Sequence, residues 1–246
     1  MAALLADYAQ HLAALALPVL VLAGDNATLA ACTRAGRPLE CTPSRSGVLA
    51  RFLVMHAFLS LGVDACWIDF DAVPMQNFLP ELYRRASAKR VGMLLMVDDP
   101  TCTPRTCFMF MRASSSNREL LFLFLQWVHA HTYEFEQSAF AAFLLSGQGL
   151  PLHDPPPGLE AALRAVTWDR VEYPPQRFVE QQRHWTGTPD RIALYHRSGC
   201  PLEEKLHYMR AALAPNRSAF RAHALRFWRP WASFTAVEPR TCQQSP

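Results

Sequence analysis

The sequence predicts an α/β fold with a mostly parallel central sheet flanked by helices. Apolar runs of strand length alternate with segments of helical periodicity through the first 150 residues, as expected when helices cover both faces of a sheet. The run at 17–22 is apolar at every position and closes at Gly24-Asp25, which is typical of a buried parallel strand. The two common glycine-rich phosphate-binding motifs are absent from the sequence.

The elements of the first hundred residues follow from the spacing of apolar residues and from capping residues. Residues 2–16 are rich in Ala and Leu and favour a helix. Asn26 is placed to cap a short helix that Gly36 ends. The remaining predicted elements are a strand at 38–41, a helix at 46–61, a strand at 64–71, a helix at 77–86 and a strand at 91–97.

The second part of the chain gives a similar alternation with longer irregular stretches. The predicted elements are a strand at 107–112, helices at 114–131 and 133–145, a loop at 147–158, short strands within an irregular 162–190, a strand at 192–196 and a helix at 202–213. We expect one domain over 1–246, with a possible seam in the proline-rich loop 151–158 and a C-terminal helical tail over 214–246.

Composition excludes several classes of protein. The chain has 246 residues, of which 50% are hydrophobic and 18% charged, so global disorder is excluded. The net charge of +3 provides no basic field, and we therefore expect no nucleic-acid partner. The longest early apolar run, 12–24, is shorter than the roughly 20 residues of a membrane span and is interrupted by Pro18. We expect no membrane span in this chain.

Seven cysteines are present without a Cys-x-x-Cys pair, which disfavours a zinc ribbon or a thioredoxin-type site. Two disulfides across short loops remain open, Cys32 with Cys41 and Cys102 with Cys107. Two glycosylation sequons, at Asn26 and Asn216, weakly favour a secretory compartment.

Asp69 and Asp71 form the most informative motif, because they end an otherwise apolar strand. Ligands of open α/β sheets bind at the carboxyl ends of strands, and residues i and i+2 of a regular strand point the same way. Two close carboxylates repel unless a cation lies between them, and Mg²⁺ or Mn²⁺ suits oxygen ligands. The pair therefore indicates a metal site that handles a diphosphate. The alternative is a solvated strand end or a capping acid.

An ordered set of motifs over about 17–213 resembles the nucleotide-diphospho-sugar transferase family of GT-A-fold glycosyltransferases, which includes plant wall α-xylosyl-, arabinosyl- and galactosyltransferases. No one motif is specific, and the resemblance rests on their order. The motifs are Val19-Leu-Val-Leu-Ala-Gly-Asp25 with Cys32 and Gly36, the helix from Arg51 to Gly62, Trp67-Ile-Asp69-Phe-Asp71, Cys107-Phe-Met-Phe-Met-Arg112, Phe135-Glu136-Gln137 with Phe140, and Ala193-Leu-Tyr-His196 with Lys205.

The resemblance implies a GT-A-like, Rossmann-like fold and a metal-dependent, retaining glycosyltransferase. Its implied substrates are a nucleotide-sugar donor and a glycan or glycoprotein acceptor, and its implied location is the Golgi or secretory lumen. The implied site residues are Asp69, Asp71 and His196 as ligands of Mn²⁺ or Mg²⁺, Glu136 and Gln137 as the catalytic pair facing the sugar, and Asp25, Asp69 and Lys205 as contacts of the nucleotide-sugar.

Simpler roles stay open for most of these residues. Asp25 could only cap a helix, Glu136 could be an acid favoured by the helix dipole, His196 could be a surface or core histidine, and Lys205 could form a structural ion pair. Positions of the family's Asn and Gly fall on Arg105 and Cys107. These departures support an alternative function as an inactive GT-A-like binding module. A metal-dependent phosphohydrolase with Asp69 as nucleophile is a further alternative.

Overall fold

A computed structural model describes residues 2–44, 47–98, 103–131, 135–148, 150–170, 179–181, 194–196 and 202–213. The predicted tail at 214–246 lies outside these residues. The chain forms two compact units: the first takes Met1–Gly47, Phe70–Leu79 and Glu172–Ala236, and the second takes Val48–Asp69, Pro80–Val171 and Val237–Pro246. The proline-rich loop 151–158 lies within the second unit. The prediction of one domain stays a prediction.

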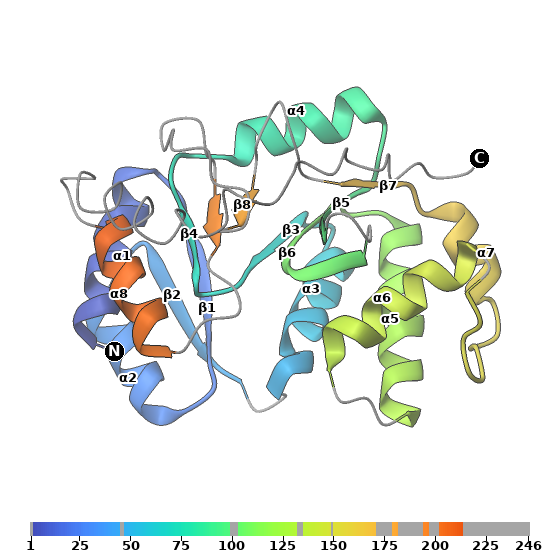
Figure 1. Ribbon diagram of the computed structural model, residues 1–246, viewed down its shortest axis with the longest axis horizontal. Helices are drawn as coiled ribbons and strands as arrows, with labels where there is room; N and C mark the ends of the chain where they lie inside the picture. Colours follow the sequence, from blue (N-terminus) through green and yellow to red (C-terminus); the bar gives the residue numbers. More distant parts are fainter. Residues whose placement is uncertain are drawn as a thin grey trace, which may run out of the picture. The chain divides into compact units, whose positions relative to one another are not determined.

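The described residues of the first unit form two small sheets and three helices (Figure 1). Its elements are α1 (Ala2–Ala14), β1 (Val19–Ala23), α2 (Asn26–Ala35), β2 (Leu39–Pro43), β4 (Ala72–Pro74), β8 (Val179–Gln181), β9 (Leu194–His196) and α8 (Leu202–Leu213). Strands β1 and β2 are parallel, with Val19 opposite Leu39. The other sheet has the order β4-β9-β8, in which β9 is antiparallel to β4 and parallel to β8.

Helix α2 is defined at both ends by its sequence. The N-cap is Asp25 and not, as predicted, Asn26, which is the first residue of the helix. Gly36 follows the helix at a φ of 72°, which is strained for any residue with a side chain. A disulfide joins Cys32 in α2 to Cys41 in β2. Cys107 is free and buried, and Cys102 lies outside the described residues. Of the two pairings left open by the sequence, the first is therefore present.

Removing this disulfide should destabilise the first unit modestly. The Cys32→Ser/Cys41→Ser double variant should lose about 2 kcal/mol of unfolding free energy, at the low end of the usual range because the cross-linked loop is short. Urea unfolding without reductant measures the difference. A reductant should lower the wild type to the level of the double variant and leave that variant unchanged. Equal stabilities of the two proteins without reductant would contradict the prediction.

The second unit is a four-stranded sheet with helices on both faces (Figure 1). Its elements are the 3₁₀ turn η1 (Gly47–Leu49), which starts at the unit boundary, α3 (Ala50–Ser60), β3 (Ala65–Ile68), α4 (Leu79–Lys89), β5 (Met93–Asp98), β6 (Thr103–Met111), α5 (Ser115–Ala130), α6 (Glu136–Leu145), the 3₁₀ turn η2 (Ser146–Gln148), α7 (Leu159–Ala165) and β7 (Trp168–Arg170). The strand order is β3-β6-β5-β7.

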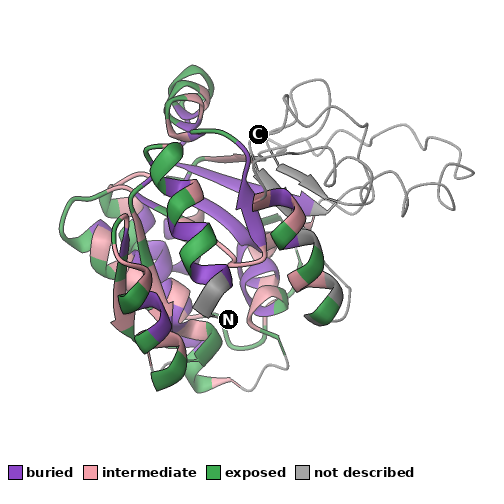
Figure 2. Cartoon of the chain, turned by 90° about the vertical axis from the view of Figure 1, so that its left-hand side faces the viewer, coloured by how far each residue is buried: buried purple, intermediate pink, exposed green. Residues whose placement is uncertain are grey.

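Alternate residues of β6 face the two helical layers, as the period of two in a strand requires. Met109 and Met111 belong to the core formed with α3, α5, α6 and α7. Phe110 points to the other face, where its ring lies 5.3 Å from that of Tyr83 in α4. Both faces of the sheet are thus covered, which explains why its strands are apolar throughout. Figure 2 shows the resulting concentration of buried residues in the strands.

The predicted α/β class is confirmed, although the sheet is less parallel than predicted. Strand β6 runs antiparallel to both β3 and β5, and only β7 is parallel to β5. The link from β5 to β6 is far too short for the crossover that parallel strands need. Helix α7 falls at the edge of a stretch predicted as irregular; it has only seven residues and no side-chain cap. No helix among the described residues combines the length and apolarity of a membrane span.

The predicted strand over 64–71 is wrong at its end. Strand β3 stops at Ile68, and Phe70 and Asp71 form a turn before β4 begins at Ala72 and pairs with a different sheet. The expectation that Asp69 and Asp71 point the same way along a regular strand is therefore incorrect. The apolar pattern continues through Ala72 and Val73, which concealed the turn.

Candidate active site

Asp69 occupies the position just after β3 and is fixed there by its backbone and its side chain. Its N–H donates to the carbonyl of Cys107 in β6 at 2.9 Å, which extends the pairing of the two strands by one residue. Its Oδ1 accepts a hydrogen bond from Nε1 of Trp67 at 2.8 Å and lies 3.2 Å from Nη1 of Arg51. The carboxylate is therefore oriented by two donors from its own unit.

Arg51, in the first turn of α3, joins the predicted site residues of the second unit. Its Nη1 contacts Asp69, and its Nη2 lies 3.2 Å from Oε1 of Glu136. Nη1 also donates to the carbonyl and to Oγ1 of Thr106, at 3.1 and 2.9 Å. The guanidinium lies 5.2 Å from the ring centre of Trp67, within range of a cation–π contact. These five residues are called the Arg51 cluster below.

The Arg51 cluster is largely shielded from water. The side chains of Arg51, Glu136 and Asp69 are 12%, 14% and 28% exposed. One guanidinium between two carboxylates compensates only one of their two charges, so the three side chains carry a net negative charge when ionised. A shielded site with uncompensated negative charge favours a cation ligand, because burial weakens the screening of charge by water.

Glu136 and Gln137 begin α6, as predicted. Phe135 precedes them without any side-chain capping bond, so the acid lies at a helix start, where the dipole favours it. Its contact with Arg51 shows that the dipole is not its sole interaction. Oε1 of Gln137 accepts from the backbone N–H of Thr106 at 3.4 Å. Glu136 is thus a member of the Arg51 cluster, and Gln137 is hydrogen-bonded to Thr106, another member of that cluster.

Asp71, Lys205 and His196 belong to the first unit. Nζ of Lys205 in α8 forms an ion pair with Oδ2 of Asp71. In the strand register, His196 of β9 lies opposite Ala72, the residue after Asp71; its side chain is outside the described part of the chain. The predicted metal ligand Asp71 and the predicted phosphate contact Lys205 therefore lie together, in the structural ion pair that was the alternative role for the lysine.

The turn that carries Asp71 is anchored by α1, which sequence reasoning did not connect to the site. The hydroxyl of Tyr8 donates to the carbonyl of Ala72 at 3.3 Å, and its ring lies 5.3 Å from that of Phe70. Burial, and secondarily the charge of Asp71, raise the pKa of Tyr8 above its usual range. His11 Nε2 lies 2.6 Å from the carbonyl of Pro74. The spacing of Tyr8 and His11 places them on one face of α1, but the carbonyl groups that they contact are distant in sequence.

Asp25 has the capping role that was one of its two possible interpretations. Its Oδ1 accepts from the backbone N–H of Thr28 at 2.7 Å, and its Oδ2 accepts from Oγ1 of Thr28 at 2.8 Å. These bonds, the backbone one first, favour the ionised form and lower the pKa of Asp25. Because the side chain is exposed, contact with a nucleotide stays a prediction.

The sequence offered one signal for Arg51 that was not used. Apart from a single histidine, Arg51 is the sole ionisable residue in α3, whose other positions are almost all apolar. A long basic side chain on such a helix requires a partner when its neighbours are buried. Its partners, however, come from three other elements and cannot be derived from the helix.

A comparison with family models matches residues 15–209 to the nucleotide-diphospho-sugar transferases. The chain belongs to this family. Transfer of a glycosyl group from a nucleotide-diphosphate sugar to an acceptor is therefore the general activity that membership supports, and this nucleotide-diphospho-sugar transferase is a glycosyltransferase by family. The matched range includes all seven predicted site residues. Comparisons with curated proteins and with solved structures found no match.

Proposed function

We propose that this chain is a metal-dependent, retaining glycosyltransferase that moves a sugar from a nucleotide-diphosphate sugar to a glycan or glycoprotein in the Golgi or secretory lumen. The observation that carries the proposal is the Arg51 cluster. Asp69 and Glu136 come from segments far apart in the sequence, yet both carboxylates contact one guanidinium. In α/β proteins, ligand sites lie at the ends of strands, and charged side chains gathered there often belong to such sites.

The donor set suits Mn²⁺ or Mg²⁺. Both side-chain contacts of Asp69 use Oδ1, and within the described residues its Oδ2 makes no hydrogen bond or ion pair. A carboxylate oxygen of this kind is a preferred ligand of hard cations. Asp71 is two residues further along the chain. If the cation binds Asp71, the ammonium group of Lys205 would leave that carboxylate and pair with a phosphate of the nucleotide-sugar. When bound, the cation would stabilise charge on the departing nucleoside diphosphate.

The chain's own residues would then position the donor sugar. Because Gln137 uses its carbonyl oxygen to accept from Thr106, its amide N–H groups are the part that can donate to a sugar hydroxyl. Glu136 would face the reacting side of the sugar, with Arg51 orienting its carboxylate. Arg51 is therefore proposed as a positioning residue for both acids.

A donor assay with matched variants tests the proposal. Wild type should release nucleoside diphosphate from at least one nucleotide-sugar in the presence of Mn²⁺, and a chelator should abolish the release. Asp69→Asn should lower the rate about 100-fold, since metal and electrostatic contacts contribute several kcal/mol to transition states. Asp7→Asn is the matched control, because Asp7 is exposed on α1, and it should keep full activity. NMR of the first-formed product tests retention of the anomeric configuration.

Equal inertness of wild type and Asp69→Asn with every donor would exclude the enzyme and leave the second candidate, a binding module of the same fold. One observation favours that candidate. Asp69 already has a basic partner in Arg51, and Asp71 has one in Lys205. A thermal-shift panel of nucleoside diphosphates with Mn²⁺ separates the two candidates. A binding module should be stabilised by one of them in wild type, less so in Asp69→Asn, without turnover of the corresponding nucleotide-sugar.

A further inference from the structure

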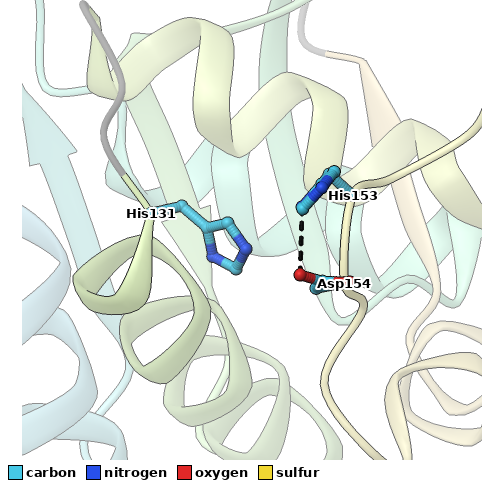
Figure 3. Close-up of side chains that lie close together, drawn as sticks. All are labelled: His131, His153 and Asp154. Atoms are coloured by element: carbon cyan, nitrogen blue, oxygen red, sulfur yellow. Dashed lines mark ion pairs between the residues drawn. The ribbon is translucent and has the colours of Figure 1, made fainter.

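A second cluster of metal-binding side chains lies in the second unit and shares no residue with the Arg51 cluster. It consists of His131, which follows α5, and the adjacent His153 and Asp154 of the proline-rich loop. Figure 3 shows the three side chains pointing toward a common space. One ligand atom from each residue can be chosen so that all three lie within 4.8 Å of one another. We propose that these residues form a zinc-binding site that joins the end of α5 to the loop.

The ring of His131 is already oriented for metal binding. Its Nδ1 lies 2.7 Å from the carbonyl oxygen of Trp127, and because a carbonyl only accepts, Nδ1 carries the proton. The lone pair is then on Nε2, which is the form in which a histidine binds a metal through one nitrogen while the other donates to a carbonyl. The ring also packs on the indole of Trp127, with centres 5.0 Å apart.

The same tryptophan fixes the loop that supplies the other two ligands. Nε1 of Trp127 donates to the carbonyl of His153 at 2.9 Å, and Leu152 packs against the core of the unit. Three consecutive prolines, 155–157, follow Asp154 and restrict the backbone. Trp127 therefore holds both segments, so most of the entropy of bringing the ligands together is lost on folding, before any metal binds.

The side chains of His153 and Asp154 provide the remaining adjustment. They are 79% and 77% exposed, and Nδ1 of the histidine lies 3.2 Å from Oδ2 of the aspartate. Bonds of about 2.1 Å to zinc place two ligand atoms no more than about 4.2 Å apart, so rotations of these exposed side chains are sufficient to close the set.

Ligand chemistry selects the metal. Two imidazole nitrogens and one carboxylate oxygen match Zn²⁺, which takes three protein ligands and leaves a fourth position for water in open sites. Mg²⁺ and Ca²⁺ prefer oxygen ligands throughout. The proposed site is therefore distinguishable from the oxygen site at Asp69, and it stands whether or not the glycosyltransferase proposal is correct.

Zinc titration of the full chain tests the site. Isothermal titration in thiol-free buffer with excess Mg²⁺, which occupies oxygen sites, should show binding of Zn²⁺ to wild type. His153→Ala and Asp154→Asn change exposed side chains, so they should fold normally and weaken this binding by about tenfold or more. His131→Phe keeps a ring on Trp127 and should weaken binding as strongly. His129→Ala, which removes an exposed histidine two residues away on α5, should leave binding unchanged.

A second readout is thermal stability. Zn²⁺ should raise the unfolding midpoint of wild type and His129→Ala, because it binds the folded state, and should raise that of His153→Ala much less. No zinc binding by wild type, or equal zinc affinity of wild type and His153→Ala, would overturn the proposal.

Discussion

Replacing Phe124 with alanine should lower the free energy of unfolding by about 4 kcal/mol. Phe124 lies in α5 and is fully buried. Its ring centre is 4.7 Å from that of Phe52 in α3, 5.0 Å from Phe140 and 5.4 Å from Phe143 in α6. The substitution removes buried apolar surface and the edge contacts to three rings, and it leaves a cavity that these rings can fill only in part.

Phe122 provides a matched control on the same helix. It is 44% exposed and its ring lies 6.1 Å from that of His56, so Phe122→Ala should cost less than about 1 kcal/mol. Urea unfolding of both variants measures the difference, with an unchanged slope showing that the exposed area of unfolding is the same. Equal losses of unfolding free energy for the two variants would contradict the stabilising role given to the contacts of Phe124 with the three neighbouring rings.

Replacing Arg51 with methionine should lower the unfolding free energy by about 3 kcal/mol, because it leaves two shielded carboxylates without a counter-charge. The methionine retains most of the apolar stem, so the loss reports on the guanidinium and its contacts with Asp69, Glu136 and Thr106. Donor turnover should fall together with stability, since both acids lose the group that orients them. Unfolding curves and turnover under identical buffer conditions are the measurements.

Three comparisons separate the charge of Arg51 from its shape. Arg51→Lys keeps the charge without the planar fork and should recover part of the stability. Adding Glu136→Gln to Arg51→Met removes one uncompensated charge and should also recover part of it. Arg84→Met breaks an ion pair to Glu81 in which the arginine is 60% exposed, and it should cost less than about 0.5 kcal/mol. A similar loss for Arg51→Met would contradict the role given to the cluster.

Local signals predicted much of the fold. The helix at 202–213 has the predicted bounds, and the helix at 26–35 ends before Gly36 as predicted, although its N-cap is Asp25 and not Asn26. Strand direction was not predicted correctly, because β6 is apolar on both faces like a parallel strand and is made antiparallel by a short link. The end of β3 was also missed, since hydrophobic spacing does not report which strand is the partner.

The sequence indicated some residues of the candidate site, but it did not indicate which residues they contact. Asp69 was identified from its position after an apolar strand, whereas Glu136 and Gln137 were identified only through the family resemblance. Arg51 and Trp67 were not, because a guanidinium that reaches Asp69, Thr106 and Glu136 depends on three elements coming together. The same limit applies to Trp127, whose indole N–H reaches a carbonyl in a loop. The spacing of residues along one helix or strand does not show which distant residue a polar side chain contacts.

The Cys32–Cys41 cross-link has a practical consequence for any preparation of this protein. Disulfides form in oxidising compartments and are rare in a reducing cytosol, so material from a cytosolic host would contain these two residues as thiols, and a mixed preparation would contain two covalent species. Alkylation followed by mass spectrometry distinguishes them. Rates and binding constants are therefore comparable between laboratories only when the oxidation state of each batch is stated.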